Sequence, residues 1–173
     1  GILKNPAAAA GWKQKLRDRC RERISKAYIE SKEDAMTEVS VLEVAKDLDL
    51  KFFVKPDDIE NKMIRTPEVN RPGLELVGYF EHFAGDRMQV IGMVESSYLN
   101  SRPDMEKRRI YPTFFESGIP CVVFTRGYEP NCLMSEMAED YGVPILGTEM
   151  GTSHFLSKAI RYLSYKLAPA ISI

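Results

Sequence analysis

Hydrophobic positions follow two different patterns along the chain. In residues 12–34 they recur every four positions, which predicts one helix with a narrow apolar stripe. From residue 36 onward they gather into short blocks separated by turn residues, which predicts alternating strands and helices. The stripe of the first helix consists of Trp12, Leu16, Cys20, Ile24 and Tyr28.

The blocks after residue 36 predict a repeated strand–loop–helix order. The predicted strands are residues 51–54, 64–69, 88–92, 121–125 and 143–146. The predicted helices are residues 40–48, 74–83, 95–100, 104–117, 130–142 and a last helix that ends at Pro169. Repeats of this kind favour an α/β fold, with a mainly parallel sheet sandwiched by helices and an extra N-terminal helix.

Several polar residues, glycines and prolines mark the expected element ends. Ser40 and Glu43 have the spacing of a capping box, and Thr152 or Ser153 is expected to cap the last helix. Residues 70–73, Asn-Arg-Pro-Gly, have Pro and Gly placed for the middle of a type II turn. The prolines give three further expectations: an edge position for strand 64–69 (Pro67), a kink or split in helix 104–117 (Pro112), and a helix start (Pro130).

Composition divides the chain at the same place as the hydrophobic pattern. The 173 residues have a net charge of −1, but residues 1–35 hold nine basic and five acidic side chains, against fifteen and twenty in residues 36–173. We therefore expect residues 1–35 to be a linker of about ten residues and a basic helix, originating as a leader, a fusion or a tag. Residues 36–173 are expected to form one domain.

The basic helix of residues 12–34 leaves two hypotheses open. Its charge suits an acidic surface, a membrane or RNA. Alternatively, it is a solvated helix whose stripe packs against the domain or a second copy of the chain. The overall net charge of −1 makes nucleic acid an unexpected partner for the whole protein. The sequence contains no run of about 18 apolar residues, so it predicts no membrane span.

The cysteines and histidines suggest no catalytic or metal site. Three widely spaced cysteines, Cys20, Cys121 and Cys132, fit neither a disulfide framework nor a metal motif, which favours free thiols in the cytoplasm. Cys121 lies in a predicted core strand and is expected to be inert. His82 and His154 have no neighbouring nucleophile or orienting acid in sequence. We expect no catalytic residue and no bound metal or cofactor in this chain.

Phosphate-binding motifs are also absent. Neither G-x-x-x-x-G-K-[ST] nor G-x-G-x-x-G occurs, and residues 147–153 have glycines but no lysine, which indicates a turn and helix cap. The candidates for an anion site are Arg126, which follows the strand 121–125, and Arg71. The alternative hypothesis is that Arg126 forms an ion pair with Glu129 across a loop in which Gly127 takes a positive φ.

Four ordered segments resemble a known family. They are residues 70–80 (NRPGLELVGYF), 86–92 (DRMQVIG), 119–130 (IPCVVFTRGYEP) and 141–146 (YGVPIL). Together with Glu95, Ser97 and the last helix, they resemble the N-terminal domain of HPr kinase/phosphorylase from about Thr37 to Ile173. This bacterial enzyme phosphorylates and dephosphorylates a serine of the phosphocarrier HPr in carbon catabolite regulation. The basic helix lies outside the resemblance.

The resemblance implies a domain similar to the substrate-binding domain of Mur ligases. It also implies a homo-oligomer, with HPr as the substrate of the parent enzyme, while ATP, magnesium and the catalytic residues belong to a C-terminal domain after residue 173. The chain is then a regulatory or assembly domain without catalysis of its own. Two alternatives are a sensor of an anionic metabolite or nucleotide, like DRTGG-type domains, and a nucleic-acid or membrane adaptor acting through residues 12–34.

Overall fold

The computed structural model describes the backbone of residues 6–35 and 37–168, and the side chains of residues 11–26 and 37–168. The chain divides into two compact units, Gly1–Thr37 and Glu38–Ile173. None of the helices in the described part of the chain combines the length and the apolar character that crossing a bilayer requires.

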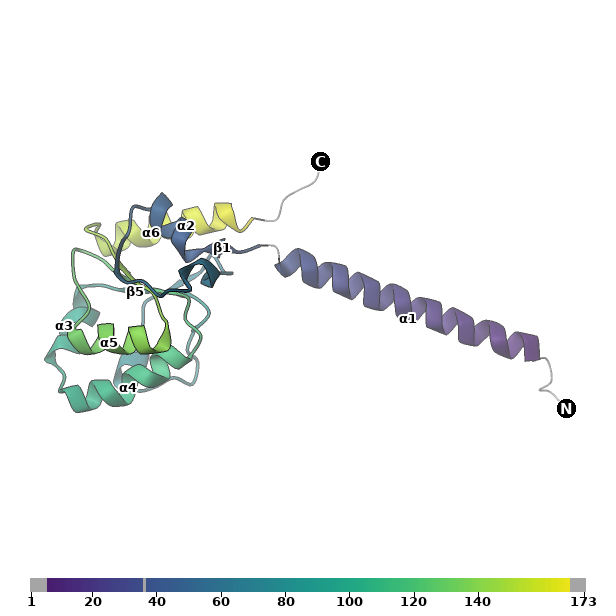
Figure 1. The fold of residues 1–173 in the computed structure, drawn as a ribbon, viewed down its shortest axis with the longest axis horizontal. Coiled ribbons are helices and arrows are strands. Elements are labelled where there is room, and N and C mark those ends of the chain that lie inside the picture. The colour runs from purple at the N-terminus through teal and green to yellow at the C-terminus, as the bar shows by residue number, and fades with distance from the viewer. Residues whose placement is uncertain (1–5, 36, 169–173) are drawn as a thin grey trace. The chain divides into compact units, whose positions relative to one another are not determined.

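The first unit contains one helix, α1 (Pro6–Ala35), drawn in purple in Figure 1. The expected ten-residue linker is wrong for residues 6–10, which are helical. Pro6 suits the first position of a helix, and the four alanines that follow have the highest helix propensity. The side chain of Tyr28, the last member of the predicted stripe, lies outside the described residues.

The second unit is an α/β domain. Its described strands are β1 (Val39–Ser40), β2 (Lys51–Val54), β3 (Met63–Ile64), β4 (Val69–Asn70), β5 (Met88–Ile91), β6 (Val122–Phe124) and β7 (Ile145–Gly147). Its described α-helices are α2 (Val41–Asp47), α3 (Met93–Ser101), α4 (Asp104–Glu116), α5 (Cys132–Tyr141) and α6 (Thr152–Lys166). Two 3₁₀ turns, η1 (Ile59–Asn61) and η2 (Leu74–Val77), complete the described elements.

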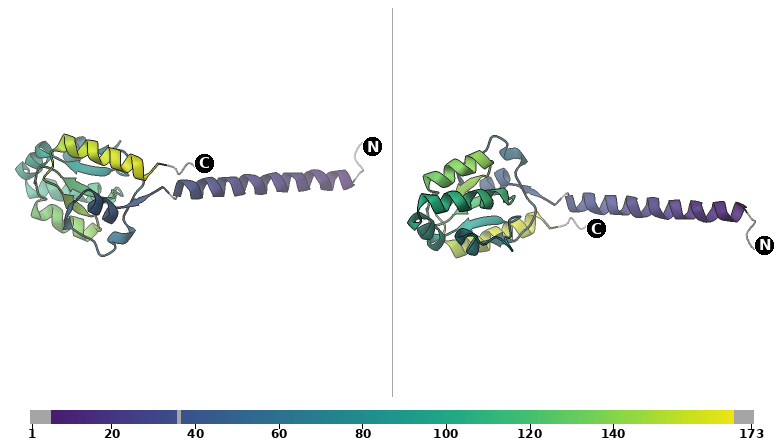
Figure 2. Two further views of the ribbon diagram at one scale, coloured as in Figure 1. Left: turned by 90° about the horizontal axis from the view of Figure 1, so that it is seen from above. Right: turned by 90° about the horizontal axis from the view of Figure 1, so that it is seen from below.

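The main sheet of the described residues has the order β2-β7-β6-β5-β4. Strands β4, β5, β6 and β7 run parallel, while β2 pairs antiparallel with β7 at one edge. Figure 2 shows α6 on one face of this sheet and α4 with α5 on the other. The predicted α/β class and mainly parallel sheet are therefore confirmed.

Each face of the sheet has its own apolar core, because successive side chains of a strand point to opposite faces. On β6, Val123 packs with Phe155 and Leu163 of α6, while Val122 and Phe124 belong to the cluster formed with α4 and α5. All five side chains are buried. The two cores fix the parallel strands, and with them the loops that follow their carboxyl ends.

The predicted strand 64–69 is wrong, since it is two strands in different sheets. Ile64 is fully buried and pairs with Val39 in a small antiparallel sheet, whereas Val69 pairs with Met88 in the main sheet. Between them, the Thr66 hydroxyl accepts a hydrogen bond from the N–H of Glu68 at 3.2 Å. This local turn ends the first strand.

The predicted helix 74–83 is also wrong, and only the turn η2 forms. Gly78 ends it in a left-handed conformation with φ 97° and donates its N–H to the carbonyl of Glu75 at 3.0 Å. Gly73 has φ −128°, so the expected type II turn does not form, because that turn needs a positive φ at this position.

Helix α4 runs past Pro112 without the split that the sequence suggests. The buried rings of Tyr111, Phe114 and Phe115 lie on either side of the proline in sequence and pack into one core. Phe114 stacks on Phe83, with the ring centres 5.5 Å apart. This packing holds the helix together although Pro112 cannot donate a backbone hydrogen bond.

The expected caps are confirmed in one place and wrong in two. The Ser40 hydroxyl accepts the N–H of Glu43 at 3.1 Å, as predicted. Helix α5 begins at Cys132, with Asn131 as its cap, rather than at Pro130. Gly151 precedes α6 without a side-chain cap, because Thr152 is buried inside its first turn. The predicted stop at Pro169 lies outside the described residues.

Candidate functional site at the carboxyl edge of the sheet

Four parallel strands present their carboxyl ends along one edge of the sheet. The loops that follow begin at Arg71 after β4, Gly92 after β5, Thr125 after β6 and Thr148 after β7. Open α/β sheets bind ligands at this edge, and both arginines predicted as anion-site candidates lie on it. Their strands, β4 and β6, flank β5, so the two backbones are roughly 10 Å apart across the sheet.

Arg71 forms a two-point ion pair with Glu95. Its Nε and Nη2 each lie 3.0 Å from a carboxylate oxygen, and the same carboxylate accepts the N–H of Gly92 at 3.0 Å. Glu95 thereby satisfies the start of α3 and neutralises Arg71 at the same time. Because its charge is already compensated, Arg71 is a weaker anion ligand than the sequence suggested.

Gly92 is the point at which three loops meet. A Cβ atom on Gly92 would lie 2.8 Å from the Thr152 hydroxyl and 3.1 Å from Nη2 of Arg71. A side chain there would force the loop after β4 away from the start of α6. Glycine is thus required by close packing at this position rather than by a positive φ.

A buried pair of hydroxyl groups joins β6 to α6. Oγ1 of Thr125 and Oγ1 of Thr152 lie 2.7 Å apart, and Thr125 is completely buried. The Thr125 hydroxyl also lies 3.4 Å from the carbonyl of Ile91 on β5. This pair fixes the first turn of α6 against the sheet edge.

Arg126 has the left-handed backbone that its position in a tight turn imposes. Its φ is 58°, its N–H donates to the carbonyl of Met150 at 2.9 Å, and Gly127 follows with φ 72°. The positive φ of Gly127 agrees with the sequence interpretation, but the alternative ion pair with Glu129 does not form. The side chain is exposed, and its guanidinium has no ion pair among the described residues.

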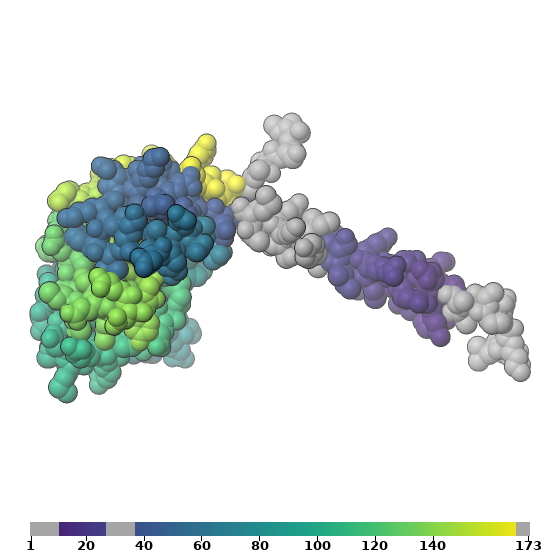
Figure 3. All heavy atoms as spheres, in the orientation of Figure 1, coloured from purple at the N-terminus to yellow at the C-terminus, as the bar shows by residue number. Residues whose placement is uncertain are grey.

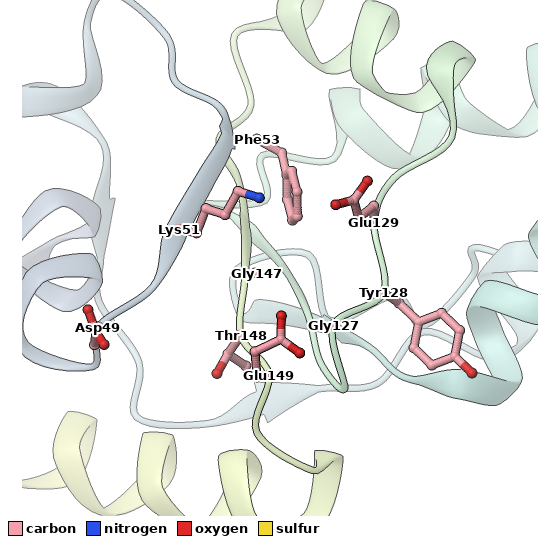
Figure 4. A pocket seen from close by; sticks show the side chains of 9 residues that line it. All are labelled: Asp49, Lys51, Phe53, Gly127, Tyr128, Glu129, Gly147, Thr148 and Glu149. Atoms are coloured by element: carbon pink, nitrogen blue, oxygen red, sulfur yellow. The ribbon is translucent and has the colours of Figure 1, made fainter.

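A pocket of about 150 Å³ lies beside this turn (Figure 4). Its lining consists of Asp49, Lys51, Phe53, Gly127, Tyr128, Glu129, Gly147, Thr148 and Glu149. The Lys51 ammonium lies 4.9 Å from the centre of the Phe53 ring, and the Glu149 carboxylate packs against Gly127. With three carboxylates against one ammonium, the pocket is unfavourable for a phosphate. Lys51 and Phe53 were not predicted as site residues, since their only signal in the sequence was their place in the strand 51–54, which forms the edge strand β2.

The thiols and imidazoles do not form a catalytic arrangement in the described part of the chain. Cys121 is buried, and burial raises the pKa of its thiol to about 12. Cys20, Cys132 and both histidines are exposed. The described residues also contain no cluster of three or more side chains suited to a metal ion.

The family that matches the second unit is described as HPr Serine kinase N terminus, and it matches residues 39–163. The chain belongs to this family. In this family member, Arg71 of the segment 70–80 pairs with Glu95 at the carboxyl edge of the sheet.

Curated relatives agree with the family. The HPr kinase/phosphorylase of Caldicellulosiruptor bescii is 35% identical over 133 residues, which is 77% of this chain and 43% of the relative. The enzyme of Lachnoclostridium phytofermentans is 42% identical over 116 residues, which is 67% of this chain and 38% of the relative. The enzyme of Caldanaerobacter subterraneus is 38% identical over 139 residues, which is 80% of this chain and 45% of the relative. The chain spans less than half the length of these relatives.

Among solved structures, the family member is similar in fold to the regulatory region of Clostridium perfringens pyrophosphatase. That structure contains CBS and DRTGG domains in complex with the activator diadenosine tetraphosphate. The TM-score is 0.51 at 14% identity, and the match covers 78% of this chain and 52% of the other. The likeness supports the α/β fold.

Proposed function

We propose that the chain is a non-catalytic regulatory and assembly domain of an HPr kinase/phosphorylase that acts in the cytoplasm. Its parent enzyme phosphorylates and dephosphorylates a serine of HPr in carbon catabolite regulation. ATP and magnesium bind to the catalytic domain of that parent. The observation that carries the proposal is the match of residues 39–163 to the N terminus of the family. We also propose that the fold of this domain resembles that of the substrate-binding domain of Mur ligases.

The assembly role is supported by an exposed apolar groove. A hollow of about 260 Å³ lies between η2 and α3, lined by Pro72, Gly73, Leu76, Val77, Val94, Glu95 and Tyr98. Val77 and Val94 are 55% and 68% exposed, and Leu74 and Met93, which adjoin the lining residues Gly73 and Val94 in sequence, are exposed as well. Apolar surface of this kind is stabilised when a partner covers it. We assign it to contact with a second copy of the chain.

Sedimentation velocity over a range of protein concentrations tests this assignment. The chain is expected to form a homo-oligomer that dissociates in the Val94→Asp variant. The free energy needed to bury an unpaired carboxylate exceeds the free energy that the apolar contact contributes. Met105→Asp is the matched control, since Met105 is 84% exposed on α4 and does not line the groove. A wild-type chain that stays monomeric at every concentration would contradict the assembly role.

The exposed guanidinium of Arg126 supports a second candidate, a sensor of an anionic metabolite or nucleotide. Arg126 lies at the carboxyl edge, without a side-chain partner among the described residues, and its N–H contacts the loop that leads into α6. Phosphorylated sugars and nucleotides should then raise the melting temperature of the chain. Arg126→Ala should abolish the shift, while Arg161→Ala on the exposed face of α6 should keep it. No stabilisation by any of these ligands would rule out the sensor.

A further inference from the structure

Helix α1 presents large apolar side chains to water. Every described side chain in residues 11–26 is exposed, and these atoms are purple in Figure 3. Trp12, Leu16 and Ile24 are 53%, 48% and 70% exposed. Cys20 is exposed too. A helix of a water-soluble protein normally buries such residues, and the described residues of this helical unit offer no surface of their own that covers the stripe.

The stripe occupies one sector of the helix. Residues four apart in an α-helix are about 40° apart around the axis, so the side chains from Trp12 to Ile24 span about 120°. Arg17 and Arg21 continue the rotation on one flank of this sector, and Lys15 and Arg19 lie on the other flank.

The acidic residues of the same stretch lie opposite the stripe. By the same rotation, Asp18 and Glu22 fall on the far side of the helix, and Asp18 also accepts a hydrogen bond from Gln14 there at 3.0 Å. The two acidic side chains therefore lie away from the apolar sector, whereas basic side chains lie on both of its flanks.

Two basic residues, Lys13 and Arg23, fall within the apolar sector. Their long aliphatic stems can lie along an apolar surface while the charged ends reach toward water. On the helix itself, the Lys13 Nζ lies 6.0 Å from the centre of the Trp12 ring.

We propose that α1 lies on an anionic lipid surface, with the sector from Trp12 to Ile24 in the interface and the flanking basic residues among the headgroups. The seven basic and two acidic side chains of residues 11–26 complement such a surface, and tryptophan favours its boundary layer. Nucleic acid is the weaker occupant, because binding its phosphates would leave the apolar sector in water. The proposal is independent of the family's catalysis.

The single tryptophan of the chain makes the binding directly measurable, because Trp12 lies in the proposed contact. The full chain is mixed with vesicles of phosphatidylcholine and phosphatidylglycerol, and with vesicles of phosphatidylcholine alone. We expect co-sedimentation and a blue shift of the Trp12 emission with the anionic vesicles. Both should be far smaller with the neutral vesicles and should weaken as salt is added. Absence of the blue shift with anionic vesicles would overturn the proposal.

Charge variants separate this contact from general attraction. A basic residue near an anionic leaflet contributes roughly a fivefold gain in binding, so Arg19→Glu/Arg23→Glu should lower the partition coefficient at least about thirtyfold. Lys158→Glu/Arg161→Glu makes the same charge change on the exposed face of α6 and should leave it nearly unchanged. An equal loss in both double variants would contradict the role of α1.

Apolar variants distinguish a membrane from RNA. Leu16→Ser/Ile24→Ser keeps every charge, so it should abolish vesicle binding, with circular dichroism reporting the helix content of the variant. Met105→Ser serves as the control for an exposed apolar residue elsewhere. Binding to duplex RNA that is tighter than vesicle binding and unaffected by Leu16→Ser/Ile24→Ser would replace the lipid proposal by a nucleic-acid contact.

Discussion

At the scale of single residues, the hydroxyl pair of Thr125 and Thr152 is a sensitive point of the sheet edge. Replacing either with valine leaves the other hydroxyl buried without its 2.7 Å partner, which should lower the free energy of unfolding by about 1–2 kcal/mol. The double variant should cost less than the sum of the two single variants, because no orphan remains. Urea unfolding of the wild type, the two single variants and the double variant measures these free energies. Strictly additive effects would show that the two hydroxyl groups are not coupled.

Burial of Cys121 and Tyr111 predicts a loss of stability at alkaline pH. Desolvation raises the pKa of each side chain to about 12 in the folded chain, whereas the unfolded thiol and phenol ionise near 9.0 and 10.0. Their contribution to stability is complete below the unfolded values and is lost as pH rises toward 12. Each group lowers the free energy of unfolding by up to about 1.4 kcal/mol per pH unit in that window.

Urea unfolding between about pH 8 and pH 11 checks this dependence. Cys121→Ala removes the thiol and should flatten the decline, although it lowers stability at neutral pH. Asn131→Asp is not a suitable control, because Nδ2 of Asn131 donates to the Tyr111 hydroxyl at 2.9 Å. The exposed Cys132→Ala is the matched control and should decline like the wild type. Identical slopes for wild type and Cys121→Ala would contradict the buried thiol.

The sequence could place single site residues but not pair them. Arg126 was expected at the carboxyl edge because it follows the most strand-like run of the chain, and it lies there. The pairing of Arg71 with Glu95 joins residues 24 positions apart. It depends on how β4 and β5 lie in the sheet, which no local pattern contains.

At the scale of elements, Pro112 is the clearest conflict between local and tertiary preference. Pro112→Ala restores a backbone donor inside α4 and should raise the free energy of unfolding by about 1–3 kcal/mol, with part of the gain offset by a more flexible unfolded chain. Thr113→Ala on the exposed face is the control and should change it by less than about 0.5 kcal/mol. A less stable Pro112→Ala variant would contradict this expectation, because it would show that the packing of the proline ring stabilises the fold more than the restored backbone hydrogen bond does.

The predicted elements were reliable where burial and local pattern agree. The uncharged strand of residues 121–125 and the helix predicted to end at Gly142 both formed, and Gly142 ends that helix in a left-handed conformation with φ 67°. Residues 64–69 and 74–83 were wrong because a side-chain turn at Thr66 and a left-handed Gly78 end each segment early. Those endings depend on single residues inside otherwise regular apolar patterns.

At the scale of the whole molecule, the chain joins a basic helical unit to an α/β domain of the HPr kinase N-terminal family. The family match begins at residue 39, after the first unit ends. The apolar groove of the domain and the apolar stripe of α1 are separate surfaces with separate proposed occupants. Variants in one are therefore expected to leave the function of the other intact.

The central claim is that this chain has the family's N-terminal domain without its catalysis. The most direct measurement is phosphoserine formation on HPr, detected by mass spectrometry after incubation with the full chain, ATP and magnesium. The full-length HPr kinase/phosphorylase of Caldicellulosiruptor bescii, a relative at 35% identity, is the positive control. We predict no phosphoserine above the enzyme-free background with the chain, and modification of HPr by the relative. Appreciable phosphorylation of HPr by the chain alone would contradict the account.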